Sequence, residues 1–305
     1  MTAPCHRALH PSTTTDTQAE RANNAMLQDL SALRERIGES HFDLRIQLQP
    51  RCGLQRLSVG KSHIHWQDTE LPLALARRAL KISGPHERVR QNTLRYDIAR
   101  RAPAFEFLPR RFDGLRILQL SDLHIDGGER LREVVGELDY DLCVITGDYR
   151  FDVSGPIVES MNRLQYVLEA VDCEFGTLAI LGNHDWLEMV PCIEEMGARV
   201  LLNEPVALRS GDAELWIAGV DDNHYYGCDD MTRALEGVPD DAFRILLAHS
   251  PASSAEAAAN GFDLYLAGHT HGGQTCLPFG LPIIRNAKCP RRHLAGAWQV
   301  GSMQG

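Results

Sequence analysis

The stretch Leu266-Ala267-Gly268-His269-Thr270-His271-Gly272-Gly273-Gln274 places two imidazoles among three glycines, directly after an apolar run that predicts a buried strand over 263–267. In an extended segment residues i and i+2 point the same way, so His269 and His271 can face one site together. The glycines allow a tight turn and the close approach of other backbone. The stretch therefore predicts a metal-binding turn at a strand end, with a solvated or hydrogen-bonded histidine pair as the alternative.

The same organisation occurs upstream, where short apolar runs typical of buried strands end in polar turns. Segments with helical patterns lie between these runs, at 129–138, 157–170 and 186–196. Strands that alternate with helices predict βαβ units and a largely parallel sheet. Ligands of such sheets bind outside the carboxyl ends of the strands. The predicted strands are 115–120, 142–146, 177–181, 215–220 and 244–247.

Five of the strand ends carry residues that form a candidate ligand set. The set combines carboxylate, imidazole and amide groups without a thiolate, which favours Mn²⁺, Fe²⁺ or Zn²⁺ over a structural zinc held by cysteines. Seven or eight ligands are too many for one tetrahedral ion but suit two ions about 3.5–4 Å apart. The residues are Asp122, His124, Asp148, Asn183, His184, His249, His269 and His271.

These residues stand in sequence blocks that resemble the calcineurin-like metallophosphoesterases, over residues 112–280. The blocks are D-x-H, G-D, G-N-H-[DE], a lone H and G-H-x-H, and all five occur here in order. The sequence GHTHGGQ is most similar to a bacterial branch whose members are broadly phosphodiesterases or pyrophosphohydrolases. The resemblance implies an α/β fold, a two-sheet sandwich flanked by helices.

The resemblance also implies a binuclear metal-dependent phosphoesterase, which hydrolyses a small-molecule phosphodiester or phosphoanhydride by attack of a metal-bound hydroxide. His184 matches the family's general acid. The alternative is a catalytically silent interaction module with the same fold. Of the two divalent ions (Mn, Fe or Zn), one would be held by Asp122, His124, Asp148 and His271, and the other by Asp148, Asn183, His249 and His269.

One departure from the family pattern follows Asp148. Many relatives have G-D-x-x-D, in which the second Asp orients the catalytic histidine. Here residues 147–152 read GDYRFD, so the spacing is one residue longer. Both Asp152 and Asp185 therefore remain candidates for orienting His184.

Further residues near these blocks have two interpretations each. Arg150 is a candidate for holding a substrate phosphate, with a surface salt bridge as the alternative. Asp221, Asp222 and His224 follow a predicted strand and can reach the site, with a polar loop as the alternative. Relatives of this branch usually continue through further strands beyond the position of Gly305. We therefore expect a phosphoesterase domain over 111–305 that lacks its closing C-terminal strands or ends differently.

Charge is divided unevenly along the 305 residues, whose formal net charge is −10. Residues 1–110 carry 17 Lys and Arg against 11 Asp and Glu, which leaves 14 against 30 for the remainder. The acidic charge of residues 111–305 argues against specific or general nucleic-acid binding, because the affinity of a protein for nucleic acid depends on a basic surface. The eight scattered cysteines form no C-x-x-C pair. Without an apolar run of 18 residues or an apolar leader, we expect no transmembrane segment and a cytoplasmic location.

Residues 1–110 form an N-terminal extension that we expect to be α+β, with 1–15 disordered. Its patterns predict a helix over 16–37, a strand or hairpin over 42–66, and helices over 71–82 and 87–100. None of the candidate ligands lies in this extension. We therefore expect that turnover does not require residues 1–40.

Overall fold

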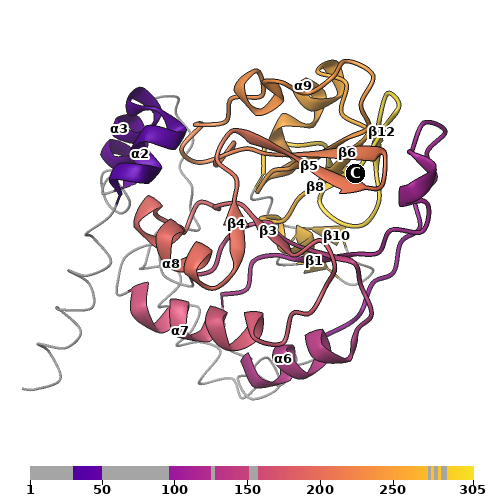
Figure 1. Ribbon diagram of the computed structural model, residues 1–305. Coiled ribbons are helices and arrows are strands. Elements are labelled where there is room, and N and C mark those ends of the chain that lie inside the picture. The colour runs from indigo at the N-terminus through magenta and orange to yellow at the C-terminus, as the bar shows by residue number, and fades with distance from the viewer. Residues whose placement is uncertain are drawn as a thin grey trace, which may run out of the picture.

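Two β-sheets pack face to face in the computed structural model, with helices on their outer sides (Figure 1). This is the expected α/β sandwich. The predicted disorder over 1–15, most of the helix over 16–37, most of the hairpin over 42–66, the helix over 71–82 and most of that over 87–100 lie outside the described residues. Residues 96–100 are described and form no helix, so the end of the last predicted helix is wrong. The structure describes residues 30–49, 96–124, 128–150, 157–273, 276–277, 281–282 and 287–305.

The first sheet is entirely parallel, in the order β1-β2-β3-β4. Three helices connect its strands and cover its outer face (Figure 1). This arrangement confirms the predicted βαβ units. The strands are β1 (Ile117–Leu120), β2 (Leu142–Ile145), β3 (Thr177–Ala179) and β4 (Ala198–Val200), and the helices are α6 (Gly128–Glu137), α7 (Ile157–Leu168) and α8 (Val190–Glu195).

The second sheet has six strands in the order β11-β12-β8-β7-β6-β5. β5 and β6 form an antiparallel hairpin, while β6, β7, β8 and β12 run parallel. The helix α9 (Ser254–Ala259) lies on the outer side of this sheet (Figure 1). Its strands are β5 (Glu204–Ser210), β6 (Ala213–Gly219), β7 (Arg244–Leu247), β8 (Leu264–Leu266), β11 (Gln299–Val300) and β12 (Met303–Gln304); a separate pair is β9 (Cys276–Leu277) with β10 (Leu281–Pro282).

The first sheet lies between two hydrophobic cores, because its buried strands carry apolar residues on both faces. In β2, Leu142 and Val144 belong to the core between the two sheets, whereas Cys143 and Ile145 belong to the core under α6 and α7. Successive side chains of a strand point to opposite faces, so a strand covered on both sides reads as a continuous apolar run. That is why this run could be recognised as a strand without any alternation.

The C-terminal residues form β11 and β12, which the sequence patterns did not predict. β12 lies parallel to β8, and the backbone N–H of Gln304 donates to the carbonyl of Asp263 at 2.9 Å. β11 pairs with β12 on its other side. The strand β8, which leads to the His269-x-His271 turn, is therefore an inner strand of its sheet.

Two N-terminal helices pack against the side of the sandwich, α2 (Ser31–Ile37) and α3 (Glu39–Leu48) (Figure 1). The strand predicted from residue 42 onward is wrong for the part that forms α3. Phe42 and Arg45 are three residues apart and lie buried on one face of this helix, while Leu44 is 47% exposed. The alternation that suggested a strand thus came from an exposed leucine. None of the helices in the described part of the chain could span a lipid bilayer. The cytoplasmic location stays a prediction.

Candidate metal centre

The candidate ligands converge because the backbone turns sharply after each strand. Asp, Asn and His tolerate the left-handed region better than most side chains, so the residue types suit the conformation as well as the chemistry. Backbone hydrogen bonds join neighbouring turns. For example, the N–H of Asp122 donates to the carbonyl of Gly147 at 3.0 Å. Positive φ values between 36° and 67° occur at Asp122, His124, Asp148, His269 and His271.

Two glycines allow these turns to approach one another closely. A Cβ atom built on Gly182 would contact Asp148 and would lie 2.8 Å from the ring of His249. A Cβ atom on Gly268 would contact the side chains of Ser121 and Asp122. Side chains at these two positions would therefore occupy the space that the candidate ligands fill.

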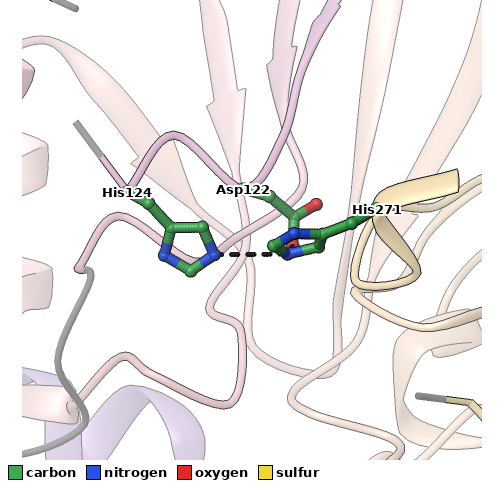
Figure 2. A group of neighbouring side chains, drawn as sticks. All are labelled: Asp122, His124 and His271. Carbon is green, nitrogen blue, oxygen red and sulfur yellow. Dashed lines mark hydrogen bonds and ion pairs between the residues drawn. The ribbon is translucent and has the colours of Figure 1, made fainter. Parts of the chain in front are cut away.

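The first group of ligand atoms comprises Asp122, His124 and His271, whose side chains point toward one another (Figure 2). The Nε2 atoms of His124 and His271 are 3.3 Å apart, and Nε2 of His271 lies 3.2 Å from Oδ1 of Asp122. The other carboxylate oxygen of Asp122 accepts hydrogen bonds from the Ser121 hydroxyl and, at 2.8 Å, from the N–H of His269. Asp122 therefore links the first strand end to the last.

The second group comprises Asp148, His249 and His269, all of them buried. Nε2 of His249 lies 3.2 Å from Oδ2 of Asp148 and 3.2 Å from Nδ1 of His269. The side-chain oxygen of Asn183 is 3.0 Å from the same His249 nitrogen. The structure thus brings all seven predicted ligands into two adjoining groups.

Backbone carbonyls orient two of the imidazoles. Nδ1 of His124 donates to the carbonyl of Arg150 at 2.6 Å, and Nδ1 of His249 donates to the carbonyl of Thr146 at 2.8 Å. Each ring consequently presents its Nε2 atom to the group it belongs to. Carbonyl partners of this kind fix the tautomer of metal-binding histidines.

The electrostatics of the second group centre on Asp148. Burial alone would raise the pKa of its carboxyl group, but His249, His184 and His124 together outweigh this effect, and the pKa lies well below its ordinary value. Burial would lower the pKa of His249, yet the carboxylates of Asp148, Asp122 and Asp222 together raise it to about 10. Burial and the neighbouring His249 hold the pKa of His269 well below its usual value. The carboxylate thus already balances one positive charge in this group.

The distances within both groups fit metal coordination. Two ligand atoms about 2.1 Å from a common ion, at angles of about 90–110°, are about 3.0–3.4 Å apart. The pairs given above are 3.0–3.3 Å apart. Carboxylate, imidazole and amide groups at these separations can hold divalent cations.

His184 lies beside these groups without belonging to either. Its Nε2 atom is 3.9 Å from Oδ2 of Asp148, and its ring centroid is 5.1 Å from that of His124. Its backbone N–H donates to Oδ1 of Asp148 at 2.9 Å. The side chain is 20% exposed, so a substrate can reach it.

Asp185 has a structural role that the sequence did not reveal. Its buried carboxylate accepts from three backbone N–H groups, those of Asp148 at 2.7 Å, Gly182 at 2.8 Å and Tyr149 at 2.9 Å. Desolvation, followed by the nearby Asp148 carboxylate, raises the pKa of Asp185 to about 6. These bonds join two ligand-bearing loops. The other candidate for orienting His184, Asp152, lies outside the described residues.

Arg150 is 2% exposed, and its guanidinium stacks over Trp186 at 4.4 Å from the ring centroid. Its contact with a substrate phosphate stays a prediction. Asp222 organises its own loop, because its carboxylate accepts from the N–H groups of Tyr225 and Tyr226 at 2.6 and 2.5 Å. His224 lies nearer the centre, with its ring centroid 4.5 Å from that of His269.

Sequence reasoning missed one residue that touches the loops around this centre, Arg45 on α3. It contacts Asp185 and Asp221, which are 140 and 176 residues away along the chain. Its neighbours in sequence give no indication of such partners. The only sequence sign is an arginine three residues after Phe42 on one helical face.

Comparison with known proteins agrees with this geometry. The family model described as calcineurin-like phosphoesterase matches residues 115–273, just over half of the chain. The uncharacterized metallophosphoesterase YkuE of Bacillus subtilis is 31% identical over 213 residues, covering 64% of this chain and 71% of that protein. A second protein of that species, the uncharacterized metallophosphoesterase YkoQ, is 26% identical over 193 residues, covering 59% and 69%.

A shorter match of 92 residues is 36% identical to the UDP-2,3-diacylglucosamine pyrophosphatase LpxG of Chlamydia muridarum and covers 27% of each chain. The family match spans all five strand ends that carry candidate ligands. Family, fold and geometry agree on one class of hydrolase, which acts on phosphate esters. The chain belongs to the calcineurin-like phosphoesterase family.

Proposed function

We propose that this protein is a binuclear metal-dependent phosphoesterase that hydrolyses a small-molecule phosphodiester or phosphoanhydride. The observation that carries the proposal is the position of Asp148 between the two ligand groups. Its Oδ2 atom lies 3.2 Å from Nε2 of His249 in one group and 3.9 Å from Nε2 of His124 in the other. One carboxylate therefore faces both groups, as a bridging ligand must.

The donor atoms decide which ions suit the site. Imidazole, carboxylate and amide groups without thiolate favour Mn²⁺, Fe²⁺ or Zn²⁺. When bound, two such ions activate a water molecule as the nucleophile and neutralise charge on the phosphoryl oxygens. We assign one ion to Asp122, His124, Asp148 and His271, and the other to Asp148, Asn183, His249 and His269.

The chain itself supplies orientation and a proton donor. Carbonyl groups hold His124 and His249 with their Nε2 atoms inward. His184 is close to Asp148 but separate from both ligand groups, so we assign it the protonation of the leaving oxygen. Arg150, beside the first group, is our candidate for a contact with the phosphate.

Similarity supports the class of bond rather than one substrate. The match to a protein named as a pyrophosphatase favours including phosphoanhydrides among the candidates. A catalytically silent interaction module is the alternative. The presence of all seven candidate ligands together with His184 argues against it.

The test combines metal analysis with a substrate panel. The purified protein, loaded with Mn²⁺, is assayed on bis-p-nitrophenyl phosphate, p-nitrophenyl phosphate and UDP-glucose, which represent a diester, a monoester and a phosphoanhydride. We expect two ions per chain, with turnover of the diester or the phosphoanhydride exceeding that of the monoester. Asp148→Asn is expected to lose both ions and all turnover. Two bound ions without turnover of any substrate would identify the silent module instead.

A further inference from the structure

The helix α3 reaches the loops of the metal centre through one side chain. We propose that Arg45 is a positioning residue for this centre, which fastens the loop that carries Asn183 to the loop that follows β6. The inference rests on the proposed function only in taking Asn183 as a ligand. It assigns a role in the phosphoesterase site to the N-terminal helices, which contribute no ligand themselves.

Arg45 is completely buried and makes three kinds of contact. Its Nε atom lies 3.2 Å from both carboxylate oxygens of Asp221, and its Nη2 atom donates to the backbone carbonyl of Asp185 at 2.9 Å. The guanidinium carbon lies 3.6 Å from the ring centroid of Tyr226. The planar guanidinium can donate in several directions and stack on an aromatic ring at once, which a lysine cannot do.

The contact with Asp185 leads directly to the ligands. Asp185 is two residues after Asn183, and its carboxylate accepts from the backbone N–H of Asp148 at 2.7 Å. Arg45 therefore holds the residue that in turn holds the backbone of the proposed bridging ligand. Only one residue separates Arg45 from Asp148 in this chain of hydrogen bonds.

Two neighbours of Arg45 strengthen the same attachment. Gln49 accepts from the N–H of Leu187 at 2.7 Å and donates to Glu188 at 2.9 Å, so it holds the continuation of the Asn183 loop. His41 lies 3.0 Å from Asp221 and supports the second loop. One face of α3 is thus directed at both loops.

Arg36, on the other helix of the pair, provides a contrast. Arg36 on α2 lies 2.8 Å from Glu194 on α8 and 3.4 Å from Glu204 on β5, and it also donates to the carbonyl of Val200. It attaches the helix pair to the sandwich as Arg45 does. None of these partners belongs to a loop that carries a candidate ligand. A change at Arg36 therefore separates attachment of the helices from positioning of the site.

Removal of Arg45 should lower the affinity for the ion assigned to Asn183 more than the affinity for the other ion. The ion held with Asp122, His124 and His271 keeps three ligands that Arg45 does not support. Changes to residues that orient metal ligands typically lower metal affinity by about 10–100-fold. We expect a decrease of that size for one of the two ions.

The experiment measures Mn²⁺ binding to the full chain by titration calorimetry, together with metal content after dialysis and thermal unfolding. The main variant combines Arg45→Met with Asp221→Asn, because the single change would leave a buried carboxylate without its guanidinium partner. Arg45→Lys keeps a charge beside Asp221 but loses the fork that also reaches Asp185. Arg36→Met is the matched control.

We expect the double variant to fold and to bind one ion about 10–100-fold more weakly, with Arg45→Lys showing a smaller loss for the same ion. Arg36→Met should lower the melting temperature and leave both affinities unchanged. Equal affinities in the double variant and the unaltered protein would overturn the inference, as would the same loss in Arg36→Met. If the double variant fails to fold, Arg45→Lys decides by the same criterion. Metal binding without turnover would refute the proposed function while leaving this test intact.

Discussion

The role assigned to His184 depends on its position, which is close to the ligand atoms but outside both ligand groups. It belongs to neither ligand group, yet its Nε2 atom lies 3.9 Å from Asp148 and its side chain is accessible. General acid catalysis matters most when the leaving oxygen is a poor leaving group, because such an oxygen departs only after protonation. The role of His184 should therefore depend on the substrate's leaving group.

We predict that His184→Gln retains both metal ions and loses little activity on a p-nitrophenyl ester, whose leaving group departs without a proton. On an alkyl phosphoester the same change should lower kcat by about 10²–10⁴-fold. Steady-state kinetics on the two substrates, with metal content measured in parallel, checks this. Equal fractional losses on both substrates, or loss of the metals, would mean that His184 only supports its loop.

At the scale of the element, the turns after the strands work as a set because they are in contact. Gly268 follows β8 and lies against Ser121 and Asp122, which follow β1. These two strands belong to different sheets. The contact therefore holds the two halves of the sandwich at a fixed spacing where the ligand groups meet.

We predict that Gly268→Ala displaces Asp122 and removes the ion assigned to it, because the added methyl group would occupy the space of the Ser121 and Asp122 side chains. Overpacking of this kind typically costs about 1–3 kcal/mol of stability. Metal content and urea unfolding measure the two effects.

Gly136→Ala is the matched control for that change. Gly136 lies in α6, where the nearest neighbour of an added methyl group would be the Cβ of Ala170 at 3.8 Å. Alanine stabilises a helix relative to glycine, by at most about 1 kcal/mol. The control should thus gain slight stability and keep both ions. Retention of both ions in Gly268→Ala would contradict the prediction, because it would show that the loops can move apart without loss of metal.

An element could be predicted from the sequence when it was long enough to show a pattern and was followed by a recognisable turn. β2 and β7 were recognisable because continuous apolar runs precede polar turns, and the helices α6 and α7 because their apolar residues recur at helical spacing. β11 and β12 have only two residues each, too short for any pattern to emerge. The pairing of β12 with β8 depends on tertiary contacts alone.

The ligand positions were equally readable, since each stands in a local pattern at a strand end. Arg45 was not, because its partners are brought to it only by the packing of α3 on the folded sandwich. The strand wrongly predicted around Leu44 has the same cause, because the packing of α3 decides which of its residues are buried. A buried polar residue on a short helix looks, in sequence, like an exposed one.

At the scale of the whole molecule, the N-terminal helices share the core of the sandwich. Leu33, Ile37 and Phe42 are buried in the same cluster as residues of α7 and α8. We expected turnover to be independent of residues 1–40. These contacts argue that removing α2 destabilises the domain, so that a truncation would test folding before it tested catalysis.

The buried pair of Arg45 and Asp221 gives this attachment a pH dependence. Burial alone would raise the pKa of Asp221, but Arg45, followed by His41, lowers it below the ordinary value of 3.8. Because the folded-state pKa is below the unfolded one, the ionised carboxylate stabilises the fold. This contribution is fully present above the unfolded pKa of about 4 and disappears as the pH falls through the folded-state pKa.

We predict that the chelator-treated protein loses unfolding free energy below about pH 4 more steeply than the Arg45→Met, Asp221→Asn double variant does. Urea unfolding between pH 2 and pH 7 measures both curves. Other buried carboxylates titrate in both proteins, so the difference between the curves isolates Asp221. Parallel curves for the double variant and the unaltered protein would contradict the prediction.

The positive φ values of five candidate ligands limit how the metal preference of this site can be redesigned. Replacing Asp122, His124, Asp148, His269 or His271 by a bulkier or β-branched ligand would add backbone strain, of about 1–2 kcal/mol, to any change in coordination. Asn183 and His249 have no such constraint. Softer donors for other metals are therefore best introduced at these two positions, where the backbone accepts any side chain that the space allows.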